Sequence, residues 1–218
     1  MQLFIDTGNL EEIREIARWG VAAGVTTNPK ILAKESGDLK SRVMEILRMV
    51  PGPLSVEVTT NDRDEMLAEA KKFAAWSEHI VVKLPMSPAG LESASLLKTH
   101  GIKTNVTAIM TVSQCMLAAL AGATYASIFY SRINDINQDG LEVIRQSAAL
   151  YKRSGFTTKI IVGSIRIPTQ ITDAAMAGAD IITVPYKFFS QLASHPQTDA
   201  TIREFLEAWE GSKALRTK

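Results

Sequence analysis

The stretch Ile80-Val81-Val82-Lys83-Leu84-Pro85 places one lysine in the middle of a short apolar run. Such a run, rich in β-branched residues and closed by a proline, is typical of a strand that is buried on both faces of a parallel sheet. Burial in apolar surroundings favours the neutral amine, the form that can attack a carbonyl. The stretch therefore predicts either a reactive amine or a lysine whose stem lies on apolar surface while its head reaches water.

Similar apolar runs alternate with longer segments of helical periodicity along the chain, the pattern of a parallel sheet with helical crossovers. Eight runs are predicted to be strands: Gln2–Asp6, Gly24–Thr27, Leu54–Val58, Ile80–Leu84, Lys103–Thr107, Tyr125–Phe129, Lys159–Val162 and Asp180–Val184. Eight such units in 218 residues match a small (β/α)₈ barrel. An open doubly wound sheet is the alternative, but the first strand leads into Asp6-Thr7-Gly8-Asn9 and not into a Gly-x-Gly-x-x-Gly turn.

The helical segments show capping signals and apolar stripes. Asn9 is expected to cap the first helix, and a last helix beginning near Thr198 carries Ile202, Phe205 and Trp209 on one face. No Pro-rich or Gly/Ser-rich linker and no shift of composition marks a second domain. We therefore expect one α/β domain over residues 1–218, a (β/α)₈ TIM barrel with a C-terminal helix.

Composition narrows the classes of partner. The chain has 24 basic and 23 acidic residues, a net charge of +1, so no overall field favours nucleic acid or a membrane surface. The single cysteine, Cys115, excludes an intramolecular disulfide and suggests a reducing compartment. No signal segment or membrane-length apolar run is evident, so we expect a cytoplasmic protein. The three histidines lack metal-ligand spacing, and neither a metal nor a cofactor is expected.

Polar residues recur where the predicted strands end. In a barrel the carboxyl ends of the strands form the active-site face, so these side chains are expected to converge there. The residues are Asp6, Thr27, Asn28, Glu57, Lys83, Asn105, Thr107, Ser131, Arg132, Ser164 and Arg166.

Each position also has a purely structural interpretation. Asp6 could cap a helix and Asn28 could open a turn before Pro29. Glu57 and Lys83 could form a structural ion pair, although two opposite charges in central strands favour a reactive site. Arg132 and Arg166 could be surface arginines, but their places directly after late strands favour a pocket for a tetrahedral anion.

These residues resemble the transaldolase family, and in particular its small members, a group that includes fructose-6-phosphate aldolases. The resemblance runs the length of the chain through Phe4-Ile5-Asp6-Thr7, Gly24-Val25-Thr26-Thr27-Asn28-Pro29, Val81-Val82-Lys83-Leu84-Pro85, Ala121-Gly122-Ala123 and Ser164-Ile165-Arg166. The family fold is a (β/α)₈ barrel. The resemblance thus implies the same architecture that the strand pattern predicts.

The resemblance also implies class I aldol chemistry without a metal. Lys83 would form a Schiff base with a ketose carbonyl, Asp6 would exchange a proton with the C4 hydroxyl, and Glu57 would act through a water held with Thr107. The remaining residues are expected to contact substrate, with the two arginines on its terminal phosphate: Thr27, Asn28, Asn105, Phe129, Ser131, Arg132, Ser164 and Arg166. Small members of the family form pentamers or decamers, so a homo-oligomer is expected.

Three positions favour a transaldolase over an aldolase. In the fructose-6-phosphate aldolases that the chain resembles, glutamine stands at the position of Glu57, an apolar residue at that of Asn105 and tyrosine at that of Phe129. The expected reaction is transfer of a dihydroxyacetone unit between sugar phosphates, as in the pentose phosphate pathway. A fructose-6-phosphate aldolase, and a lyase or isomerase that forms no Schiff base, are alternatives.

One segment departs from the family pattern. The chain reads Ser127-Ile128-Phe129-Tyr130-Ser131-Arg132 where the family usually has Ser-Pro-Phe-Val-Gly-Arg. The bulkier residues could simply repack the strand. They could also alter the anion pocket so that it takes a sulfonate, as in transaldolases that act on 6-deoxy-6-sulfofructose.

Overall fold

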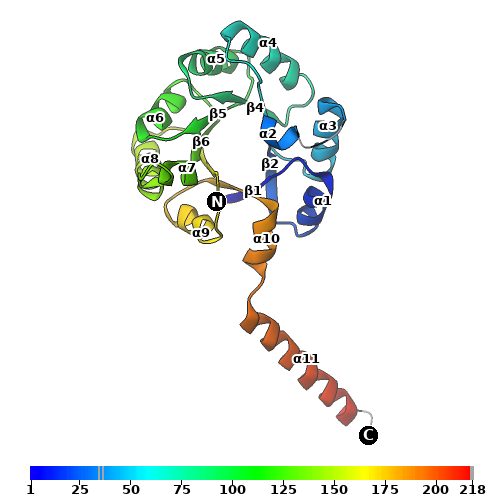
Figure 1. Ribbon diagram of the computed structural model, residues 1–218. Helices are drawn as coiled ribbons and strands as arrows, with labels where there is room; N and C mark the ends of the chain where they lie inside the picture. Colours follow the sequence, from blue (N-terminus) through cyan, green and yellow to red (C-terminus); the bar gives the residue numbers. More distant parts are fainter. Residues whose placement is uncertain (34, 36, 217–218) are drawn as a thin grey trace.

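Eight parallel strands close into a barrel in the computed structural model, which describes residues 1–33, 35 and 37–216 (Figure 1). Each strand pairs with the next along the chain, and β1 pairs with β8 to complete the ring. The strands are β1 (Gln2–Asp6), β2 (Ala22–Thr26), β3 (Leu54–Glu57), β4 (Ile80–Pro85), β5 (Thr104–Ile109), β6 (Tyr125–Phe129), β7 (Lys159–Gly163) and β8 (Ile181–Val184). The predicted (β/α)₈ barrel is confirmed.

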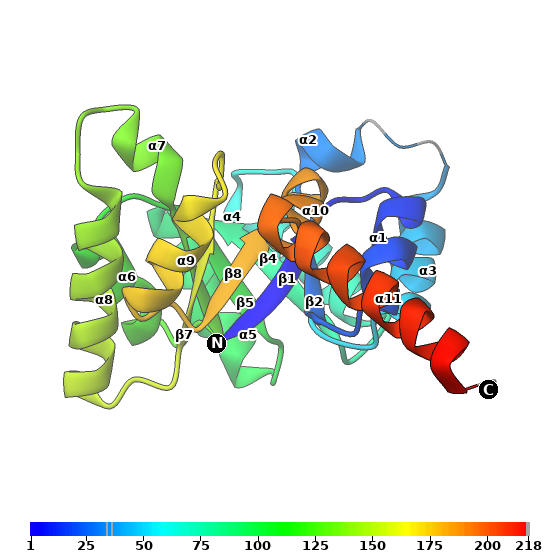
Figure 2. The same ribbon diagram turned by 90° about the horizontal axis from the view of Figure 1, so that it is seen from below.

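The helices lie outside the ring of strands; most of them pack around it, and the last helix of the chain projects away from it (Figures 1 and 2). They are α1 (Leu10–Arg18), α2 (Pro29–Leu32), α3 (Leu39–Met49), α4 (Arg63–Ala74), α5 (Pro88–Thr99), α6 (Val112–Leu120), α7 (Tyr130–Asn134), α8 (Gly140–Ser154), α9 (Thr169–Met176), α10 (Tyr186–Ala193) and α11 (Pro196–Arg216). Asn9 caps α1 as predicted, because its side chain accepts bonds from the first-turn N–H groups of Glu11 and Glu12. Ile13 and Ile16 then bury the apolar face of α1 against the sheet.

Every strand boundary lies within two residues of the prediction, and the two-residue extension at the end of β5 is the most informative difference. It continues to Ile109, and its register with β6 shifts between Val106 and Ile109. Ala108 within this irregularity has a φ of 61°, a left-handed conformation that is uncommon for alanine. A bulge of this kind leaves no trace in the apolar pattern, which explains why the sequence predicted an earlier end.

The barrel interior has an apolar layer below a polar one. Phe4, Val81, Tyr125, Ile161 and Ile181 form a buried cluster inside the ring. Side chains two positions apart in a strand face the same side, so the next inward position lies one layer closer to the carboxyl ends. On four of these strands that position is polar: Asp6, Lys83, Ser127 and Thr183. The alternation therefore places the polar residues together on a packed floor.

Gly24 makes room for this floor. A Cβ atom at that position would lie 2.8 Å from the ring of Phe4 and 2.6 Å from the carbonyl oxygen of Pro53. A side chain on β2 would thus displace either the ring or the neighbouring strand.

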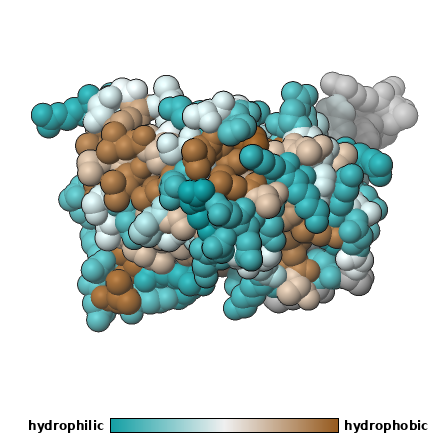
Figure 3. Space-filling model, turned by 90° about the horizontal axis from the view of Figure 1, so that it is seen from above, coloured by the Kyte–Doolittle hydropathy of each residue, from teal (hydrophilic) through white to brown (hydrophobic). Residues whose placement is uncertain are grey.

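Helix α11 projects away from the barrel (Figure 1). It begins at Pro196, two residues earlier than predicted, and Ile202, Phe205, Leu206 and Trp209 are exposed on it. Hydrophobic residues also gather in patches on the face shown in Figure 3. Elsewhere in the chain, Leu117 and Leu120 of α6 are exposed. None of the helices in the described ranges is long and apolar enough to cross a membrane.

Candidate active site

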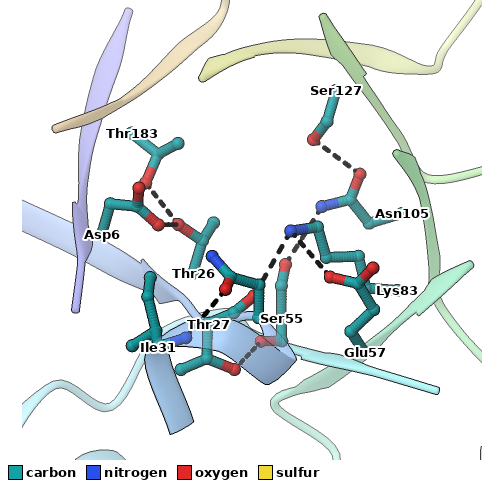
Figure 4. Close-up of polar contacts among 11 residues, drawn as sticks. Asp6, Thr26, Thr27, Ile31, Ser55, Glu57, Lys83, Asn105, Ser127 and Thr183 are labelled. Atoms are coloured by element: carbon teal, nitrogen blue, oxygen red, sulfur yellow. Dashed lines mark hydrogen bonds and ion pairs between the residues drawn. The ribbon is translucent and has the colours of Figure 1, made fainter. Parts of the chain in front are cut away.

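Lys83 lies inside the barrel and does not reach out to bulk water. Only 5% of the residue is exposed, and its Nζ lies 3.2 Å from Oε2 of Glu57 on β3. The same ammonium donates to the carbonyl oxygen of Thr27 at 3.3 Å (Figure 4). Glu57 and Lys83 are register partners of β3 and β4, so the strand pairing itself brings the two charges together. The interpretation of Lys83 as a strand-end lysine with a solvated head is excluded.

Asp6 faces the same space from the other side of the barrel (Figure 4). Its Oδ1 accepts a 2.9 Å hydrogen bond from Oγ1 of Thr26, which in turn contacts Oγ1 of Thr183. Burial raises the pKa of the Asp6 carboxyl, while the charge of Lys83 and the bond from Thr26 oppose the rise. Asp6 does not cap α1, because Asn9 has that role. Its carboxyl group is thus buried and lines a cavity.

A chain of buried hydrogen bonds links β3, β5 and β6 beside Lys83. Oγ of Ser127 donates to Oδ1 of Asn105 at 2.8 Å, and Nδ2 of Asn105 donates to Oγ of Ser55 at 3.2 Å (Figure 4). Asn105 is fully buried. The two bonds fix the orientation of its amide, because one hydroxyl donates to the oxygen and the other accepts from the nitrogen.

Thr27, Asn28 and Thr107 differ in how their polar groups are used. The Thr27 hydroxyl donates to the carbonyl of Ser55. Thr27 therefore meets Lys83 through its backbone carbonyl and not through its side chain. Asn28 caps α2 by accepting from the N–H of Ile31, which confirms its structural role, and it also lines the cavity. The buried Oγ1 of Thr107 has no partner among the described residues. An unsatisfied buried hydroxyl of this kind is suited to binding a water or a substrate group.

A cavity of about 130 Å³ opens at the carboxyl ends of the strands. Its lining residues come from six strands and the turns that follow them: Asp6, Thr26, Asn28, Lys83, Ser127, Phe129, Arg132, Gly163, Ser164 and Thr183. Ser164 has a φ of 59°, a strained left-handed conformation for a serine. Six of the predicted site residues therefore meet in one cavity: Asp6, Asn28, Lys83, Phe129, Arg132 and Ser164.

The two arginines are placed differently. The guanidinium of Arg132 lies 5.4 Å from the centre of the Phe129 ring and lines the cavity. Arg166 lies outside the cavity lining and forms a two-bond fork with Asp135, at 2.6 and 2.7 Å. These bonds lower the pKa of Asp135. Within the described ranges, Arg132 has no carboxylate at ion-pair distance, and of the two arginines it is the one that lines the cavity.

Ser131 points away from the cavity. The residue is buried, and its hydroxyl donates to Oε1 of Gln170 at 3.0 Å. Glu57 likewise does not line the main cavity but faces a neighbouring one of about 240 Å³, together with Leu32 of α2 and Leu39 of α3.

Sequence reasoning left three hydroxyl residues of the cavity out of the site: Thr26, Ser127 and Thr183. Ser127 and Thr183 lie two positions after the floor residues Tyr125 and Ile181, so they face the same side of the strand. Thr26 directly precedes the predicted site residue Thr27. A buried hydroxyl needs a hydrogen-bond partner, so a serine or threonine inside an apolar strand is the available signal. No three His, Cys, Asp or Glu side chains cluster as metal ligands would in the part of the chain that the structure describes.

The fold and this cavity define a (β/α)₈ barrel protein whose lysine, carboxylates and hydroxyls meet at the face where barrel enzymes carry their chemistry. The family model for transaldolase/fructose-6-phosphate aldolase matches residues 3–217. The chain therefore belongs to the transaldolase/fructose-6-phosphate aldolase family.

Individual relatives agree with this assignment. A probable transaldolase of Alkaliphilus metalliredigens is 48% identical over 211 residues, which cover 97% of this chain and 99% of the relative. A probable transaldolase of Geobacter metallireducens is 48% identical over 210 residues, which cover 96% and 98%. Among solved structures, a thiamine phosphate pyrophosphorylase from Pyrococcus furiosus has a TM-score of 0.59 at 15% identity, covering 84% of this chain and 85% of that chain. That last likeness concerns the fold alone.

Proposed function

We propose that this chain is a class I transaldolase. It transfers a dihydroxyacetone unit from a ketose phosphate, fructose 6-phosphate or sedoheptulose 7-phosphate, to an aldose phosphate acceptor. The observation that carries the proposal is the buried Nζ of Lys83, which has Glu57 at 3.2 Å and opens on a cavity shared with Asp6. The names of the relatives at 48% identity support the same activity.

In this proposal the neutral Nζ of Lys83 adds to the C2 carbonyl of the ketose, and loss of water with uptake of one proton, delivered through Glu57, gives a protonated imine. Asp6 accepts the proton of the C4 hydroxyl while the C3–C4 bond breaks, and the bonding electrons enter the imine to form an enamine. The aldose fragment leaves and an acceptor aldehyde takes its place. The enamine carbon attacks the aldehyde, and Asp6 returns the proton to the new hydroxyl.

Glu57 manages the protons of imine formation and hydrolysis. Its carboxylate lies next to Nζ, and 21% of its side chain is exposed towards the neighbouring cavity. A water that enters from that side can reach Glu57 without crossing the substrate. The unpartnered hydroxyl of Thr107 supports the proposal that such a water is held between the two residues.

Arg132 binds the terminal phosphate of the substrate. Its guanidinium has no competing carboxylate at ion-pair distance among the described residues, whereas Asp135 already holds Arg166 in a fork. In this proposal Arg166, which is already paired with Asp135, contributes less than Arg132 to phosphate binding.

The arginine pair gives an expected order of effects. Arg132→Ala should raise KM for fructose 6-phosphate by roughly 10- to 100-fold, the scale of a lost charge-assisted hydrogen bond, and Arg166→Ala should raise it less. Steady-state kinetics with fructose 6-phosphate and with fructose measure this, because fructose has no phosphate and should respond to neither variant. A larger effect of Arg166→Ala would contradict the assignment of Arg132.

Transfer and release of the dihydroxyacetone unit can be separated directly. The purified enzyme is expected to exchange this unit from fructose 6-phosphate onto erythrose 4-phosphate much faster than it liberates free dihydroxyacetone. Parallel assays of sedoheptulose 7-phosphate and of free dihydroxyacetone measure the two rates. Equal rates would instead assign a fructose-6-phosphate aldolase.

Two finer points complete the proposal. The structure gives no support to a sulfonate ligand through Ser131, because that hydroxyl is bound to Gln170. Phosphate is the anion that we propose, because membership of the transaldolase/fructose-6-phosphate aldolase family favours sugar phosphate substrates. The exposed apolar side chains of α11, such as Phe205 and Trp209, support a homo-oligomer, a pentamer or decamer, in which this helix is covered by another copy.

A further inference from the structure

The side chain of Gln170 joins the cavity wall that carries Arg132 to the turn that carries Arg166. Its Oε1 accepts the backbone N–H of Arg166 at 2.8 Å and the hydroxyl of Ser131 at 3.0 Å. The residue is buried, with 7% of its surface exposed. One carbonyl oxygen thus joins the β6–α7 segment to the β7–α9 segment.

The orientation of this amide is determined by its partners. A backbone N–H can only donate, so the atom that faces Arg166 must be the oxygen of the Gln170 amide. The N–H of Ile167 also points at this oxygen, at 3.4 Å. The Ser131 hydroxyl must therefore act as donor, and its proton is not available to an anion at the same time.

Further contacts close the frame around the two segments. The backbone N–H of Ser131 donates to the carbonyl of Ser164 at 3.3 Å, and Asp135 at the end of α7 holds the guanidinium of Arg166. The strained φ of Ser164 lies in this frame, next to the cavity. Backbone strain of this kind persists only where surrounding contacts hold the segment in place. The bonds of Gln170 to Ser131 and Arg166, on either side of Ser164 in the frame, are among those contacts.

We infer that Gln170, through its bonds to Ser131 and Arg166, is a positioning residue that sets the affinity of the site for the terminal oxyanion of the substrate. The inference rests on the proposed function, in which Arg132 binds that anion. Gln170 itself does not line the cavity, so it acts through the residues that it holds. When charged donors are already held in a fixed arrangement, less conformational entropy is lost on binding, so the affinity for the ligand is higher.

The chain contains a matched control. Gln114 accepts the backbone N–H of Met110 at 2.8 Å, the same four-residue arrangement that joins Gln170 to Arg166. Gln114 stands near the start of α6, and among the described residues its side chain has no hydrogen bond to the segments that carry Arg132 and Arg166. Gln114→Met therefore removes a comparable loop bond without touching the anion site.

The test compares Gln170→Met, Ser131→Ala, the double variant and Gln114→Met. Gln170→Met is expected to raise KM for fructose 6-phosphate and Kd for inorganic phosphate about five- to tenfold, the scale of one or two lost hydrogen bonds. Its kcat and its turnover of fructose should change less than twofold. Ser131→Ala should give a smaller change in the same direction, and the double variant should resemble Gln170→Met because the two residues act through one contact. Gln114→Met should match the wild type.

Each outcome decides the inference. Equal phosphate Kd values for the wild type and Gln170→Met would overturn it, as would a fall in kcat with fructose as large as that with fructose 6-phosphate, which would indicate general loosening of the barrel. A wild type that binds no inorganic phosphate in calorimetry would overturn it too. A wild type that binds phosphate but exchanges no dihydroxyacetone unit would refute the proposed function alone, and the phosphate Kd would still test Gln170.

Discussion

Lys83→Met should abolish transfer of the dihydroxyacetone unit, with kcat reduced by on the order of 10⁴-fold or more, the scale seen when a catalytic nucleophile is removed. Methionine fills nearly the same volume but has no amine, so no imine can form. Assays of sedoheptulose 7-phosphate formation with a purified variant measure the loss. Activity within tenfold of the wild type would contradict the covalent role.

The fold of Lys83→Met is expected to survive. The substitution removes a buried ammonium but leaves Glu57 without its cation, and complete removal of a buried partner costs about 3–5 kcal/mol. Because 21% of the Glu57 side chain is exposed, the loss should be smaller than that range. Urea unfolding of Lys83→Met and Lys83→Met/Glu57→Gln measures it. Lys103→Met is the matched control, since Lys103 is exposed and donates to the carbonyl of Glu78.

Asp6→Asn has the second largest expected effect, a fall in kcat/KM by roughly 10²–10⁴-fold, the usual range for loss of a general acid–base group. Asparagine keeps the shape of the side chain and can still accept from Thr26, but it cannot take a proton from the C4 hydroxyl. Rates of cleavage and of exchange should fall together, because both directions use the same proton. A variant that lost less than threefold would assign that proton transfer to another group.

The pH dependence follows from the burial of Asp6. Its pKa is raised above the ordinary value of 3.8, so the acid limb of kcat/KM should lie at a higher pH than for an exposed aspartate. The hydrogen bond from Thr26 lowers this pKa, so Thr26→Val should move the limb further up in pH. An unchanged limb in Thr26→Val would contradict the assignment of the limb to Asp6.

The raised pKa of Asp6 should also make the stability of the folded protein depend on pH. A carboxyl with a raised folded-state pKa favours the folded state at low pH, and that contribution is lost as the pH rises through the folded pKa. Asp6→Asn should therefore gain stability relative to the wild type as the pH rises above 3.8. The pKa of Asp6 is raised overall because burial destabilises its charged form by more than Lys83 and Thr26 stabilise it.

The barrel and the centre of the site were predictable because they depend on local patterns. Eight apolar runs marked the strands, and the positions of Lys83 and Asp6 near the carboxyl ends of their strands predicted that both would face the same end of the barrel. Glu57 was predicted to lie beside Lys83, and the pairing of β3 with β4 makes the two residues partners in register.

The edge of the site could not be predicted in the same way. Arg166 pairs with Asp135, and Ser131 bonds to Gln170 instead of facing the cavity. Both arrangements depend on contacts between residues more than 30 positions apart in the chain. The bulge at Ala108 similarly depends on the pairing of β5 with β6. These features arise from tertiary packing, which periodicity and residue type do not encode.

The central claim is that Lys83 forms an imine with the ketose. The most direct measurement is borohydride reduction of the enzyme during turnover of fructose 6-phosphate, followed by mass spectrometry of its peptides. The account predicts loss of activity and a substrate-derived mass increase on the peptide that contains Lys83, both absent without substrate. Continued turnover with no adduct on Lys83 would contradict it and would favour a barrel lyase or isomerase in which Lys83 is only the electrostatic partner of Glu57.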